Sequence, residues 1–226
     1  MPLTTAASTE ATLQDIERML RKIDGLGIPR SWRPSVERVL VRQASKMMDY
    51  ALSWQGGHGR RTAALARRIG VFAELPDESL HHLTLAALLH DIGLLVLPPR
   101  LASDAGCLDV QSYAARQSHP RLGAEWLRRY TFLRKASVII AHHHERWDGS
   151  GYPYGIRGSF IPIEARVLAI ADAVDSIRTP EVTDPNERER TAFRILTIGA
   201  GTQFDPHLVE ICGHCLQRPS LIFAFN

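Results

Sequence analysis

Cysteine is scarce in this sequence, which contains only Cys107, Cys212 and Cys215. An odd and widely spaced set of three does not support a scaffold built on disulfides, so we expect reduced thiols. The last two form the motif CGHC, whose spacing also suits a redox dithiol or half of a zinc site. The motif lies near the end of the chain after a helix-like apolar pattern, and the nearby histidines are His207 and His214. We therefore interpret the cysteine pair as packing residues at a helix end.

Long apolar runs and a strong net charge are also missing. No run of eighteen apolar residues occurs, and the stretch MPLTTAASTE lacks the basic start and apolar core of a signal peptide. These absences predict a cytoplasmic protein without membrane partners. The net charge of +3 is too small to indicate DNA binding. The 226 residues are 45% hydrophobic, which suits one or at most two globular domains with a sizeable core.

Apolar residues recur at helical spacing along most of the chain, which predicts an all-α fold. Residues 77–91 are apolar on nearly every face, so we expect this helix to be central and buried. Gly70 is expected to end its helix, and a short hairpin is expected at 153–162 around Gly158. We expect residues 1–45 to form a short helical appendage and residues 46–226 to form the main domain. The expected helices are 13–24, 34–53, 58–70, 77–91, 110–116, 120–130, 133–145, 163–178, 187–198 and 205–217.

Histidines and aspartates at helix ends are the candidate functional residues. His90 and Asp91 end the apolar segment LTLAALLHD, and burying such a pair without partners would cost on the order of several kcal/mol. A metal ion compensates the pair, because imidazole and carboxylate form a mixed set suited to iron, manganese, zinc or nickel. Asp175 follows Asp172 by about one helical turn and is a candidate neighbour. The other candidate ligands are His58, His119, His143, His144 and Asp172.

The order of these residues resembles the HD-GYP family, a branch of the HD phosphohydrolase superfamily. The resemblance covers about residues 50 to 215 and rests on five segments. They are AALLHDIG (86–93), HPRLGAEWL (119–127), HHERWDGSGYP (143–153), IPIEARVLAIADAVDS (161–176) and GAGTQFDP (199–206). The resemblance implies an HD-domain helical bundle with a short GYP loop or hairpin in residues 46–226. It also implies hydrolysis of the bacterial second messenger cyclic di-GMP with two or three metal ions, often iron or manganese.

Carried over residue by residue, the resemblance implies a binuclear metal centre. It implies that Asp91 bridges both metals, and it indicates no separate general base. Two cations about 3.5 to 4 Å apart can share a water molecule and hold the attacked phosphate. The first metal would be bound by His58, His90, Asp91 and Asp172, and the second by His119, His143, His144 and the same Asp91. His143 and His144 are adjacent residues that diverge by about 100° on a helix, so they require a helix end, which we expect at Asp148.

The sequence also departs from the family pattern. Trp54 stands where three-metal members have a glutamate, so we expect two metals. Leu94 replaces a lysine that can meet the substrate phosphate. Acidic and neutral residues from Glu181 to Asp184 replace a basic phosphate-binding segment, which leaves Arg178 as the nearby basic candidate. We therefore expect a phosphodiesterase with weakened phosphate recognition.

Other functions remain open at this point. The protein is alternatively a regulatory module that binds GGDEF-domain partners or nucleotide, or a hydrolase of another cyclic dinucleotide, a linear dinucleotide or a nucleotide monophosphate. Tyr152 and Tyr154 then serve either as exposed anchors or as residues that pack the loop. The loop that contacts substrate or partner would include Asp148, Gly151, Tyr152 and Pro153. A homodimer is one candidate assembly.

Overall fold

In the computed structural model of the protein, the described residues are 6–25, 27–52, 56–98, 101, 110–177 and 185–216. They form helices and no strand, with one isolated bridge between Ala200 and Phe204, so the expected all-α class is confirmed. The helices are α1 (Ala6–Gly25), α2 (Arg33–Ala51), α3 (His58–Phe72), α4 (Asp77–Leu89), α5 (Gly93–Val96), α7 (Val110–Arg116), α8 (His119–Leu127), η1 (Thr131–Leu133), α9 (Arg134–Ala141), η2 (Gly158–Phe160), α10 (Ile163–Ser176), α11 (Pro185–Gly199) and α12 (Pro206–Leu216).

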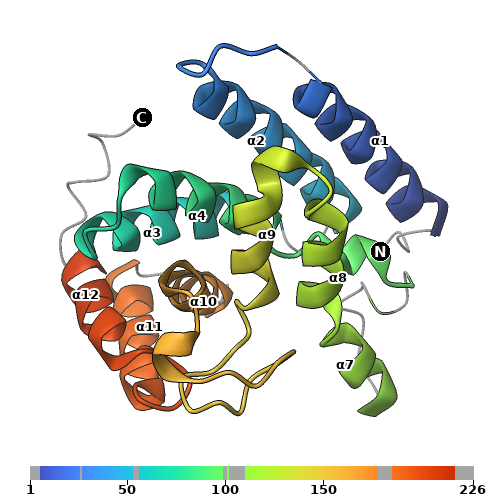
Figure 1. The fold of residues 1–226 in the computed structure, drawn as a ribbon. Helices are drawn as coiled ribbons and strands as arrows, with labels where there is room; N and C mark the ends of the chain where they lie inside the picture. Colours follow the sequence, from blue (N-terminus) through green and yellow to red (C-terminus); the bar gives the residue numbers. More distant parts are fainter. Residues whose placement is uncertain are drawn as a thin grey trace.

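Helix α10 lies in the middle of the bundle and is seen nearly end-on in Figure 1. It contacts α3, α4, α9, α11 and α12. Apolar residues on several of its faces, among them Val167, Leu168 and Ile170, are completely buried, as expected for a helix with neighbours all around. Helix α4 is similarly apolar and lies against α2, α3 and α9, which confirms its expected central position.

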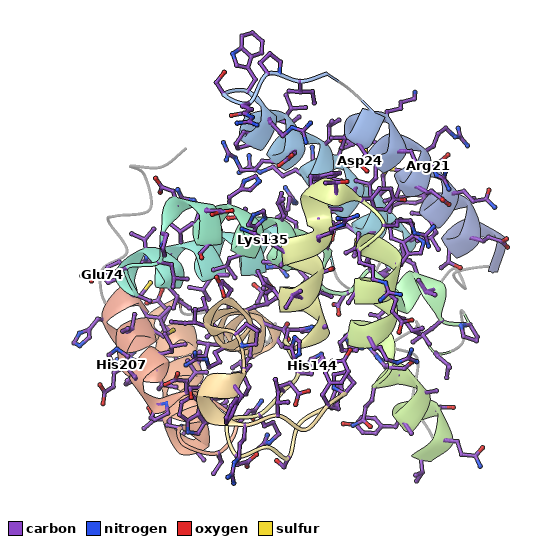
Figure 2. All side chains as sticks on the ribbon, viewed as in Figure 1. Arg21, Asp24, Glu74, Lys135, His144 and His207 are labelled. Carbon is purple, nitrogen blue, oxygen red and sulfur yellow. The ribbon has the colours of Figure 1, made fainter. Side chains whose placement is uncertain are left out.

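Helices α1 and α2 lie side by side at one edge of the bundle (Figure 1). Ile16, Leu20 and Ile23 of α1 belong to the same buried cluster as the central helices. Asp24, labelled in Figure 2, accepts a hydrogen bond from the backbone N–H of Thr131 at 3.0 Å, which ties the end of α1 to the start of η1. The expected division between residues 45 and 46 falls within α2, and it stays a prediction.

Two expected helix ends are wrong. Helix α3 continues to Phe72 past Gly70, where a Cβ would lie 2.8 Å from Leu80 Cδ2. The glycine therefore allows α4 to approach α3 and does not end the helix. Helix α9 ends at Ala141, well before Asp148. His142 closes the last turn, donating its backbone N–H to Ile139 O at 3.2 Å.

The expected hairpin at 153–162 is also wrong. Its backbone pairs with other segments, because Gly158 N–H donates to Trp147 O at 3.0 Å while Asp148 N–H donates to Thr202 O at 2.8 Å. The only regular structure within 153–162 is the short η2, and α10 begins directly after this segment at Ile163. Residues 147–158 form an irregular loop, called the GYP loop below, that leads from the region of α9 to α10 (Figure 1).

Two further features of the helices bear on the sequence predictions. Cys212 and Cys215 are free thiols buried in α12, as expected for packing residues. Burial raises the pKa of Cys212 to about 12 and that of Cys215 to about 11. Among the described helices, none combines the length and the apolar character needed to cross a bilayer.

Candidate metal centre

The seven candidate ligands come from separate elements that meet beside α10. His58 and His119 are the first residues of α3 and α8, and His90 directly follows α4. The remaining ligands are Asp91 next to His90, Asp172 within α10, and His143 and His144 in the turn after α9. His144 lies at the lower end of α9 in the view of Figure 2. The structure thus brings together all seven residues that the sequence singled out, while their role as metal ligands stays a prediction.

The first group of potential ligands contains His58, His90 and Asp172, whose ligand atoms lie within 4.8 Å of one another. His58 Nε2 lies 3.1 Å from His90 Nε2 and 3.1 Å from Asp172 Oδ1. Asp91 Oδ2 faces this group at 3.3 Å from His90 Nε2. Two imidazole nitrogens and two carboxylates therefore converge on one small region.

The second group contains His119, His143 and His144, again with ligand atoms within 4.8 Å. The rings of His143 and His144 are 4.0 Å apart, and that of His119 is 5.0 Å from His144. Asp91 Oδ1 lies 3.3 Å from His119 Nε2. Since the other oxygen of Asp91 faces the first group, Asp91 occupies a bridging position between the two.

Two glycines allow the backbone to approach closely at this centre. A Cβ on Gly93 would lie 2.0 Å from His119 O, so the start of α5 packs directly against the start of α8. A Cβ on Gly151 would lie 2.6 Å from His144 O. The next residue, Tyr152, donates its N–H to that same oxygen at 3.2 Å. These contacts explain the glycines of the HDIG and GYP segments.

Hydrogen bonds fix the orientation of most of the imidazoles. A backbone carbonyl can only accept, so the Nδ1 that faces it carries the proton and leaves Nε2 free for a metal. This applies to His90 with Ala87 O at 2.9 Å and His143 with Ile140 O at 2.6 Å. It also applies to His119, whose Nδ1 lies 2.9 Å from Arg116 O. His58 differs, because its Nδ1 lies 2.8 Å from the carboxylate of Asp175.

Burial and hydrogen bonds at the centre shift the pKa values of its residues in opposite directions. Burial would lower the pKa of His58, but hydrogen bonds to Asp172 and Asp175 outweigh it and raise the pKa to about 10. Burial would raise the pKa of Asp172, but its hydrogen bonds to His58 and His90 hold the pKa well below its usual range. Burial and the neighbouring His119 lower the pKa of His144 to about 4. Burial likewise holds the pKa of His143 well below its usual range, so His143 and His144 are neutral near pH 7.

These residues fit divalent metal ions. His143 Nε2 is buried and, within the described part of the chain, has no hydrogen-bond partner. Two imidazole nitrogens of the first group also face each other at 3.1 Å with carboxylate oxygens beside them. A cation satisfies both arrangements, and mixed imidazole and carboxylate sets suit first-row transition metals. The histidine and aspartate groups of the protein can therefore hold metal.

Three further residues support the centre. The sequence did not predict a role for Arg61 or Glu145, and it predicted Asp175 only as a neighbour of Asp172. Asp175 bonds to His58. Arg61 is not among the candidates predicted from the sequence, yet its Nε donates to Asp175 Oδ1 at 2.9 Å. Glu145 is buried and accepts a hydrogen bond from Tyr154 N at 2.7 Å, which shapes the GYP loop. The available signal was spacing, since Arg61 and Asp175 each follow a ligand by three residues on the same helix.

The GYP loop divides into a packed part and an exposed part. Tyr152 packs with its ring centroid 5.0 Å from that of His144. Tyr154 is 54% exposed. Asp148 accepts hydrogen bonds from the backbone N–H and the hydroxyl of Ser150, which closes the tip of the loop. Of the two tyrosines, Tyr152 therefore packs the loop and Tyr154 is the exposed one.

The departures from the family pattern are only partly described by the structure. Leu94 is 2% exposed and lies in the hydrophobic core. Trp54, Cys107, Arg178 and residues 181–184 lie outside the described residues. The expected effect of Trp54 on metal number and that of residues 181–184 on phosphate binding stay predictions.

The fold and the paired histidine and aspartate groups define the class of protein. The sequence model of the HD domain family matches residues 42–208, so the chain belongs to this family. A solved structure of a HDG"Y"P protein from Bdellovibrio bacteriovorus has the same fold, with a TM-score of 0.61 and 18% identity over 93% of this chain and 70% of its own. The expected HD-GYP resemblance is thereby confirmed.

Curated relatives carry names of cyclic dinucleotide enzymes. The chain is 32% identical over 213 residues to 3'3'-cGAMP-specific phosphodiesterase 2 of Vibrio cholerae, and this match covers 89% of the chain. It is 31% identical over 179 residues, or 77% of this chain, to the cyclic di-GMP phosphodiesterase response regulator RpfG of Xanthomonas campestris. The matches span 41% and 47% of these two relatives, so the chain corresponds to less than half of either.

Proposed function

We propose that this chain is a metal-dependent phosphodiesterase that hydrolyses cyclic di-GMP or a related cyclic dinucleotide. The observation that carries the proposal is the placement of Asp91, with one oxygen facing each of two histidine groups. Such a carboxylate suits two adjacent cations, which is the arrangement used for in-line attack on phosphodiesters. The names of the relatives support cyclic dinucleotides as the substrate class.

We infer that the seven residues hold two divalent ions, with iron or manganese expected from the mixed nitrogen and oxygen set. When bound, such ions lower the pKa of a coordinated water and neutralise charge on the phosphate. The chain itself supplies fixed geometry. His90, His119 and His143 keep Nε2 directed inward because backbone carbonyls hold their Nδ1 protons. Asp91 spans both groups and thereby sets their separation.

Phosphate recognition is expected to be weaker than in relatives that have basic residues at these positions. Leu94 carries no charge, and the segment from Glu181 to Asp184 is acidic where the family is basic. Each lost charge-assisted hydrogen bond is worth about 1.5 to 3 kcal/mol. We therefore expect the loss to appear as a raised KM for cyclic di-GMP.

The test is hydrolysis of cyclic di-GMP and of 3'3'-cGAMP by protein loaded with iron or manganese. The double substitution of His90→Ala and Asp91→Ala is expected to abolish turnover. His142→Ala is the matched control, because His142 belongs to the same run of three histidines but bonds to Val138 O within α9. Turnover that persists in the double variant would refute the proposed centre.

A regulatory module is the second candidate function. Tyr154 and Phe160, 54% and 81% exposed, present apolar surface on and beside the GYP loop that suits a protein partner such as a GGDEF domain. Metal binding without turnover of any cyclic dinucleotide, together with GGDEF-domain binding that Tyr154→Ala weakens, would favour this function. A homodimer and a cytoplasmic location stay predictions.

A further inference from the structure

The two groups of potential ligands differ in the partners that hold the Nδ1 atoms of their histidines. In the second group, His119 and His143 are held at Nδ1 by the backbone oxygens of Arg116 and Ile140. In the first group, His90 is likewise held by the backbone oxygen of Ala87, but His58 is held by the side-chain carboxylate of Asp175 at 2.8 Å. A carboxylate behind a ligating imidazole fixes the ring and makes it a stronger ligand than a neutral carbonyl does.

Asp175 is itself held firmly by Arg61. The guanidinium donates from Nε to Asp175 Oδ1 at 2.9 Å and from Nη2 to Oδ2 at 2.9 Å, which makes the ion pair bidentate. Arg61 Nη1 also donates to Gly56 O at 2.6 Å, in the turn that precedes His58. Arg61 therefore joins α10 to α3 and to the turn that presents His58.

The burial of these two residues indicates how the contact works. The side chain of Asp175 is 2% exposed, whereas that of Arg61 is 44% exposed. A buried carboxylate needs partners, and Asp175 finds them in His58 and Arg61. The contact with Arg61 thus holds the Asp175 carboxylate directly behind His58, between α3 and α10.

The first group also has more negative charge among its own ligands. It contains the carboxylate of Asp172, whereas the second group consists of three imidazoles. Both share Asp91. Divalent cations bind more tightly where carboxylates neutralise their charge, so the first group offers the stronger position on two independent grounds.

We propose that the two positions bind metal with unequal affinity: the position of His58, His90 and Asp172 fills first, and Asp175 and Arg61 are positioning residues that set the affinity of that position alone. The inference rests on the proposed function to the extent that both groups bind metal. It adds the order in which the positions fill. When metal is limiting, the first position holds an ion while the second is empty, so the binuclear centre is not complete.

The test is a titration of the metal-free 226-residue chain with Mn²⁺, with the unbound ion measured by electron paramagnetic resonance. The unchanged protein should bind two equivalents in two phases at least about tenfold apart in affinity. Asp175→Ala should weaken the tight phase by about 10- to 100-fold and leave the weak phase unchanged. Asp175→Asn keeps an acceptor for His58 and should lose less.

Ligand variants assign the phases to the groups. His58→Ala should remove the tight phase, and His143→Ala should remove the weak one. Arg61→Met, at a partly exposed position, serves if Asp175→Ala does not fold, and it should weaken the tight phase severalfold. Asp205→Asn is the matched control, because Asp205 is another buried aspartate, paired with Arg166 Nη1 at 2.6 Å. Its loss should leave both phases unchanged.

Equal affinities in the unchanged protein would overturn the inference. It would also be overturned if Asp175→Ala weakened both phases alike, or neither. Turnover plays no part in this measurement. Two-phase binding by a protein that cleaves no cyclic dinucleotide would therefore support unequal positions while it refuted the proposed activity.

Discussion

Single residues position the candidate ligands through close backbone packing. Gly93 places the start of α5 against His119, the first residue of α8, and therefore sets how His119 meets Asp91. The neighbouring Gly123 of α8 takes part in the same contact, since a Cβ there would lie 3.1 Å from Gly93 N. Packing of this kind transmits small shifts directly to the ligands.

We expect Gly93→Ala to destabilise the protein and to displace His119. The new Cβ would lie 2.0 Å from His119 O, so α5 and α8 must separate. Overpacking of this kind should lower the free energy of unfolding by about 1 to 3 kcal/mol. Urea denaturation measures this change. Gly27→Ala is the control, because nothing lies within 4 Å of a Cβ there. An unchanged free energy in Gly93→Ala would contradict the packing described here.

At this scale the sequence predicted ligand candidates better than the residues behind them. His58, His90 and Asp172 belong to motifs with their own order and spacing, and they meet as expected. Asp175 lies in the segment 161–176 but was expected only as a neighbour of Asp172, and Arg61, 114 residues away in the sequence, belongs to none of the five segments. Their pairing depends on how α3 and α10 pack, and helix packing is a tertiary property that local spacing does not determine.

At the scale of elements, apolar periodicity predicted the helices but not all of their ends. A buried stripe depends on many residues, so one atypical residue does not hide it. A helix end depends on a few local hydrogen bonds. Gly70 suggested an end, yet its lack of a side chain serves the contact with Leu80. The end of α9 at Ala141 depends on the turn that follows and on a GYP loop that packs back on His144.

The two cysteines of α12 provide a test of burial at this scale. Burial raises the pKa of Cys212 to about 12 and that of Cys215 to about 11. The reactive thiolate is therefore disfavoured in the folded state at pH 8, and access is blocked as well. In a Cys107→Ser background, iodoacetamide should modify neither thiol in the native protein and both in denaturant, as measured by mass spectrometry. Rapid native modification would show that α12 does not pack as described.

At the scale of the whole molecule, α1 and α2 bear on where the domain begins. The family match starts at residue 42, within α2. Helix α1 lies outside the match, but it contacts α2 and α5, and its apolar side chains join the common core. An appendage that unfolds independently would not share a buried cluster with α4 and α10. We propose that residues 6–52 unfold together with the helices that carry the metal centre.

Leu20→Ala tests this proposal. Leu20 is completely buried in the shared core, and removing such a side chain costs about 2 to 5 kcal/mol. If the helices form one cooperative unit, thermal unfolding followed by circular dichroism should remain a single transition at a lower temperature. Val39→Ala, at a position on α2 that is 64% exposed, should change stability by no more than about 0.5 kcal/mol. A separate early transition in Leu20→Ala, with the main transition unmoved, would instead make residues 1–45 the appendage that the sequence predicts. The metal centre would then not depend on α1 for its stability.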